Sequence, residues 1–74
     1  MAGFVKGSLA WKQRMLGAYV IGMHAYRGKI DDPDRDVDYK RFEQDMTKLV
    51  AYYLLGDDSV ETCDHLKERI REEK

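Results

Sequence analysis

Residues 37–56, VDYKRFEQDMTKLVAYYLLG, form the stretch that decides the fold. Six apolar residues follow one another at spacings of three, four, three, one and three: Tyr39, Phe42, Met46, Leu49, Val50 and Tyr53. These spacings place all six on one side of a helix with about 3.6 residues per turn, and charged side chains occupy the other side. Gly56 then supplies a stop. We therefore expect an amphipathic helix over about residues 37–55.

A first helix is expected upstream of this stretch, over about residues 8–27. Ser8 is a favourable N-cap, and Gly28 offers the left-handed backbone position that ends many helices. The residues of this helix are apolar around nearly its whole circumference, and two of its interior residues are glycines, Gly17 and Gly22. Each interior glycine costs roughly 1 kcal/mol relative to alanine, so a kinked or broken helix is the alternative to a continuous one.

A third helix is expected downstream, over about residues 59–73. Asp58 and Glu61 have the spacing of a capping box at its start. Its apolar stripe is thinner and consists of Val60, Cys63, Leu66 and Ile70. A chain of 74 residues without internal repeats has material for one modest core. The sequence therefore predicts an all-α, three-helix protein with residues 1–74 in a single helical domain.

Self-association is predicted from the composition of the first helix. A chain this short buries only about 60% of the surface that its unfolded form exposes, and two thin helices cannot cover an apolar helix on all sides. A second face of the first helix carries mostly small residues, which would let another backbone approach closely. We expect a homodimer or larger oligomer through this helix, with four self-association residues: Ala18, Ile21, Gly22 and Ala25.

The charge distribution suggests where a different partner would bind. Residues 1–30 contain five basic residues and no acidic residue, whereas residues 31–74 carry eight bases and fourteen acids, so the two parts differ as +5 against −6. A basic surface attracts nucleic acid, anionic lipid or an acidic protein, or it packs beside the acidic part of the same chain or of a second copy. The candidate partner-binding residues are Lys6, Trp11, Lys12, Arg14, Arg27 and Lys29.

Alternating acids precede the second helix and partly match a calcium-binding loop. Counting from Asp32 places Asp34, Asp36 and Glu43 at ligand positions of an EF-hand, but Val37 stands where that loop needs glycine. The simpler interpretation is that these aspartates cap the helix and complement its dipole. We assign no metal-ligating residues.

Catalysis and a membrane span are not expected from this sequence. Cys63 lies on an apolar stripe, and neither His24 nor His65 has the partners of a catalytic base or the spacing of a zinc site. The apolar run from Met15 to Tyr26 is shorter than the roughly twenty residues that cross a bilayer. The single cysteine is compatible with a reducing, cytoplasmic environment.

The function expected from the sequence is that of a non-enzymatic protein-protein interaction or regulatory module without a cofactor. Such a small accessory protein would self-associate and bind a larger protein. The first alternative is a nucleic-acid-binding protein that uses the basic N-terminal segment. The second alternative is a divalent-cation-binding loop protein that uses residues 32–38.

Overall fold

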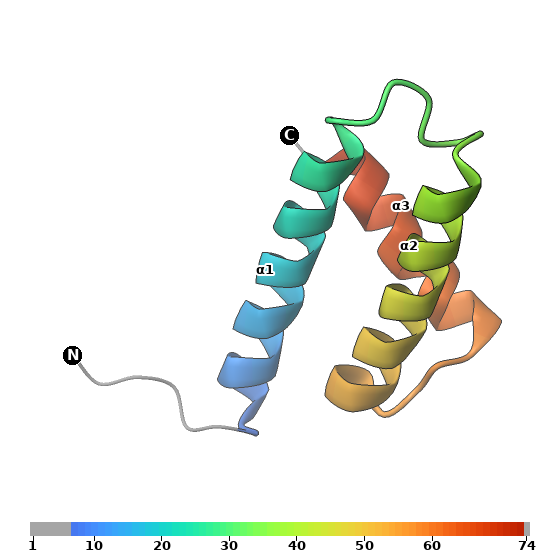
Figure 1. The fold of residues 1–74 in the computed structure, drawn as a ribbon. Helices are drawn as coiled ribbons and strands as arrows, with labels where there is room; N and C mark the ends of the chain where they lie inside the picture. The colour runs from blue at the N-terminus through green and yellow to red at the C-terminus, as the bar shows by residue number, and fades with distance from the viewer. Residues whose placement is uncertain (1–6, 74) are drawn as a thin grey trace.

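The computed structural model describes residues 7–73, and within them the protein is all-α with three α-helices. The elements are α1 (Leu9–Arg27), α2 (Val37–Val50), a π-helical turn η1 (Ala51–Leu55) and α3 (Val60–Glu72). Figure 1 shows α1 and α2 running antiparallel side by side, with α3 crossing behind both. The predicted fold class is therefore confirmed. Among the described residues, no helix has the length and apolar character needed to traverse a bilayer.

The first helix is continuous, so the alternative of a break at Gly17 or Gly22 is not what the chain forms. Ser8 caps it as predicted, because its Oγ accepts a hydrogen bond from the Trp11 amide at 3.2 Å. The left-handed conformation predicted for Gly28 is wrong, since its φ is −66°. The helix ends instead in tightened turns, in which Lys29 N–H donates to Tyr26 O and Ile30 N–H to Arg27 O.

The second helical segment has the predicted bounds, because α2 and η1 together span residues 37–55. Asp36 is the N-cap, and its Oδ1 accepts a hydrogen bond from the Tyr39 amide at 2.8 Å. The capping interpretation is thus confirmed for this aspartate. Gly56 ends the segment with φ of +66°, a conformation that costs little only for glycine.

The start of α3 differs from the predicted capping box. Ser59 is the N-cap, and its Oγ accepts from the Thr62 amide. Asp57, rather than Asp58, supports it: Oδ1 accepts from Ser59 N–H and Oδ2 from the Thr62 hydroxyl. These donors hold the pKa of Asp57 below its usual value, the Ser59 amide first among them.

The core lies where α3 packs on the α1–α2 pair. Val20, Met23, Tyr39 and Ile70 form its centre, with Tyr19 and Ile30 packed against it. On α3, Leu66 and Ile70 are buried as expected, whereas Val60 is 77% exposed. The core is therefore small and one-sided.

The buried line of α2 and η1 is rotated from the predicted stripe. The buried residues follow one another at spacings of four, four, four and three: Tyr39, Glu43, Thr47, Ala51 and Leu54. Of the six predicted stripe residues only Tyr39 is buried, and Phe42, Leu49 and Tyr53 are exposed. The apolar stripe is therefore not the buried side of this segment, because two polar residues, Glu43 and Thr47, have partners inside, while apolar residues are left outside.

Candidate protein-binding groove

An apolar groove runs between α1 and the α2–η1 segment. Its volume is about 600 Å³, and the residues that line it come only from these elements: Trp11, Met15, Ala18 and Tyr19 from α1, with Leu49, Val50, Tyr53 and Leu54 opposite. No residue of α3 is part of this lining. Large apolar side chains are left open to solvent here, since Leu49 is 58% and Tyr53 65% exposed. We call this surface the α1–α2 groove.

A polar contact ties the two walls of the groove together beneath the apolar lining. The Tyr19 hydroxyl and the Thr47 Oγ1 lie 2.6 Å apart, and Thr47 is fully buried. Burial raises the pKa of Tyr19, and the hydrogen bond to Thr47 partly offsets this. Because these two polar groups satisfy each other, the groove offers an incoming partner an apolar surface.

The predicted self-association residues extend this surface along α1. Ala18, Ile21, Gly22 and Ala25 are all exposed, and a Cβ added at Gly22 would meet no atom within 4 Å. Ala18 belongs both to this group and to the lining of the α1–α2 groove. We call the four the small-residue stripe. Their position on an open apolar surface is observed, whereas pairing through them stays a prediction.

The predicted partner-binding residues are divided between the two ends of α1. Trp11 lines the groove, with Lys12 partly buried and Arg14 exposed beside it in the chain, while Lys29 is exposed beyond the other end. Arg27 turns inward, and Lys6 falls outside the described residues. The structure therefore does not gather the described members of this set on one surface, and nucleic-acid binding through them stays a prediction.

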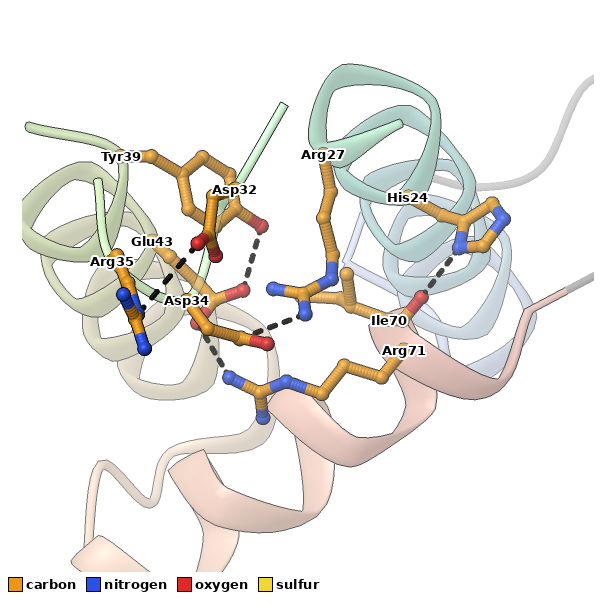
Figure 2. A network of polar contacts seen from close by, with 9 residues as sticks. All are labelled: His24, Arg27, Asp32, Asp34, Arg35, Tyr39, Glu43, Ile70 and Arg71. Atoms are coloured by element: carbon orange, nitrogen blue, oxygen red, sulfur yellow. Dashed lines mark hydrogen bonds and ion pairs between the residues drawn. The ribbon is translucent and has the colours of Figure 1, made fainter. Parts of the chain in front are cut away.

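A polar network joins the C-terminal ends of α1 and α3 to the start of α2, as Figure 2 shows. The Tyr39 hydroxyl donates to Glu43 Oε2 at 2.7 Å, and Arg71 Nη2 donates to Glu43 Oε1 at 3.3 Å. Arg27 Nη2 lies 2.8 Å from Asp34 Oδ1, and its guanidinium sits 5.9 Å from the centre of the Tyr39 ring. The hydrogen bond from Arg27 lowers the pKa of Asp34. Sequence analysis missed Glu43 as a core residue.

Stability is expected to fall between pH 10 and pH 12 because of Tyr39. Burial, followed by its hydrogen bond to Glu43, raises the pKa of Tyr39 from 10.0 to about 12. The folded state then holds this proton more tightly than the unfolded state, so the contribution is complete below pH 10 and is lost as pH rises through 12. A shift of this size corresponds to about 2–3 kcal/mol.

The check is urea unfolding of wild type and Tyr39→Phe at several values of pH across this window. Groups that titrate in both proteins cancel in the comparison, so the wild type should lose more stability with pH than the variant. Parallel curves would show that Tyr39 is not the group responsible.

The predicted cation loop is occupied by other interactions. Asp36 caps α2, Asp34 pairs with Arg27, and Asp32 Oδ2 lies 3.7 Å from Arg35 Nε. Among residues 7–73, no three carboxylate, histidine or cysteine side chains are grouped so as to hold a metal ion.

The residues considered for catalysis also have structural contacts. His24 Nδ1–H donates to the Ile70 carbonyl at 2.7 Å and so links α1 to α3. The Cys63 thiol is 3.7 Å from the Asp58 carbonyl and lines a cleft between α2 and α3 with Lys48 and Lys67. The His24 contact therefore joins two helices, whereas the Cys63 contact lies at the start of α3.

Comparison with known proteins gives no relative for this chain. No family model, no curated protein and no solved structure matches it. The function is therefore inferred from the geometry of the chain itself.

Proposed function

We propose that this chain is a non-enzymatic protein-interaction module that binds an amphipathic helix in the α1–α2 groove. The observation that carries the proposal is the open groove itself, with eight lining residues between two antiparallel helical segments. Exposed apolar patches of this kind on small proteins mark sites of protein association. A role in regulating a larger protein in the cytoplasm is part of the proposal, and the single free thiol, Cys63, suits that compartment.

The shape of the groove favours a helix as its occupant. Its lining runs from Trp11 to Tyr19 on α1 and from Leu49 to Leu54 on the opposite segment, which is about two and a half helical turns on one wall and about one and a half on the other. A helix presenting apolar residues at every third or fourth position would lie along both walls and cover their exposed side chains. An extended peptide has no free strand edge to pair with within residues 7–73, which contain helices and their connections only.

Two neighbouring tyrosines provide a matched test of this function. Tyr53 and Tyr52 are each 65% exposed, but only Tyr53 lines the α1–α2 groove. We expect the purified protein to select apolar-striped members from a library of helical peptides, and Tyr53→Asp to weaken their binding at least about tenfold, since a charge is then placed in an apolar contact. Tyr52→Asp should bind them like the wild type.

Binding is measured by fluorescence anisotropy of a labelled selected peptide. A library that yields no binder would contradict the proposed function. Equal loss in Tyr52→Asp and Tyr53→Asp would show that the peptides bind elsewhere. Circular dichroism of both variants confirms that the helices are intact.

A further inference from the structure

We infer that the chain's own residues 1–6 cover the α1–α2 groove until a partner helix displaces them, and that Phe4 is the side chain that enters it. The inference rests on the proposed function, because it concerns the regulation of that same groove. The segment has the sequence MAGFVK, with two adjacent apolar residues, Phe4 and Val5, and no acidic residue. It therefore offers an apolar surface of the kind that the groove lacks.

The first support is the place where the segment joins the described part of the chain. That part begins at Gly7, and Trp11, the first lining residue of α1, follows four residues later. Since α1 and α2 are antiparallel, the start of α1 and the end of η1 lie at the same end of the molecule, as Figure 1 shows. Tyr53 and Leu54 thus line the groove at the end where residues 1–6 are attached.

The second support is the length of the segment. Six extended residues span about 20 Å. The α1 lining runs from Trp11 to Tyr19, about 12 Å of helix, and it begins about 6 Å along the helix from Gly7. A segment that turns back along α1 can therefore cover the whole lining. Phe4 is three residues from Gly7 and reaches about 10 Å, which is the part of the groove between Trp11 and Met15.

The third support is the turn that such a path requires. A segment that lies along α1 must reverse its direction directly before the helix begins. Gly7 has φ of +87°, a left-handed conformation that residues with a side chain rarely adopt. An added Cβ at Gly7 would meet no atom within 4 Å. The glycine is therefore needed for its backbone conformation rather than for space, as expected where a chain turns back.

Covalent attachment favours this segment over a free molecule as the resting occupant. A short linker holds an attached ligand at an effective concentration of millimolar order. The aromatic ring of Phe4 also suits the lining, since Trp11 and Tyr53 supply rings and Met15 supplies a thioether. If the segment covers the groove in about nine molecules of ten, the apparent affinity for a partner helix falls about tenfold.

The first measurement is the nuclear Overhauser effect between the Phe4 ring and the Met15 methyl group in the full chain, without any peptide. We expect this contact within one chain. A mixed sample of labelled and unlabelled chains separates it from a contact between two chains. Absence of the contact, or its presence only between chains, would overturn the inference.

The second measurement is the anisotropy of a labelled helical peptide selected as described for the proposed function. Phe4→Ser should bind this peptide about tenfold more tightly than the wild type, because the groove is then uncovered. The matched control is Ala2→Ser, which adds a hydroxyl to the same segment but retains the ring, and it should bind like the wild type. Equal affinities of Phe4→Ser and wild type would contradict the inference. Circular dichroism verifies the helices of both variants.

Failure of this inference is distinguishable from failure of the proposed function. A library without binders, together with the contact between Phe4 and Met15, would reject a helix as the partner and retain the segment as the occupant. Peptides that bind wild type and Phe4→Ser equally, without that contact, would retain the proposed function and reject the segment.

Discussion

The Ile70→Ala variant should lose about 2–5 kcal/mol of its free energy of unfolding, which is the cost of emptying a buried aliphatic site. Ile70 is fully buried at the centre of the core, between α1 and the start of α2. A domain of this length has a total stability of about 4–11 kcal/mol, so the single change removes a large part of it. The measurement is urea unfolding followed by circular dichroism.

Val60→Ala is the control for this variant because it shortens another aliphatic side chain of the same helix. Val60 is 77% exposed, so the change should stay within about 0.5 kcal/mol of wild type. If Ile70→Ala unfolded at the same urea concentration as wild type, α3 would not be packed as the structure has it.

The Glu43→Ala variant should lose about 2–4 kcal/mol, since it leaves the buried Tyr39 hydroxyl and Arg71 without their shared acceptor. Glu43 is only 3% exposed, whereas the Arg71 side chain is 44% exposed, and water therefore compensates part of the loss. Glu43→Gln retains an oxygen that accepts from Tyr39 and should lose less than the alanine variant.

The exposed Glu68→Ala provides the comparison on α3, and its stability should match that of wild type within about 0.5 kcal/mol. Unfolding curves of the three variants rank the contributions. Equal losses in Glu43→Ala and Glu43→Gln would mean that the negative charge matters and the hydrogen bond from Tyr39 does not.

Helix bounds were predictable because local chemistry determines them. Ser8, Asp36 and Ser59 each accept a hydrogen bond from the amide three residues on, and these residue types are common N-caps. Gly56 ends the second segment by adopting a conformation that other residues avoid. Gly28 shows the limit of this reasoning, since a glycine permits the left-handed conformation without requiring it.

The direction in which each helix faces was not predictable to the same degree. The periodicity of the sequence identified the apolar side of α2, but it could not show from which side α3 packs against that helix. The core formed at the edge of the apolar side, around Tyr39. Glu43 and Thr47 are polar, so a search for apolar residues passes over them. Their spacing of four from Tyr39 and from each other was the available signal.

The sequence predicted only one of the two walls of the groove. The first helix is apolar on nearly all sides, and the other two helices of the chain cannot cover it. This predicted an exposed surface on α1, and the small-residue stripe lies there. The opposite wall was missed because Leu49 and Tyr53 were predicted only as members of the apolar stripe of the second helix, and the stripe does not show that they are exposed. An excess of apolar residues over what a short chain can enclose marks such a surface, without showing which residues form it.

The short connections between successive helices bear on how quickly the chain folds. Residues 28–36 and 56–59 join neighbours in sequence that are also neighbours in space, so little chain entropy is spent on closing loops. Helical proteins with mostly local contacts fold within microseconds to milliseconds. The α1–α2 groove would therefore be formed as soon as the chain folds, and a helix of the kind proposed would meet a preformed surface.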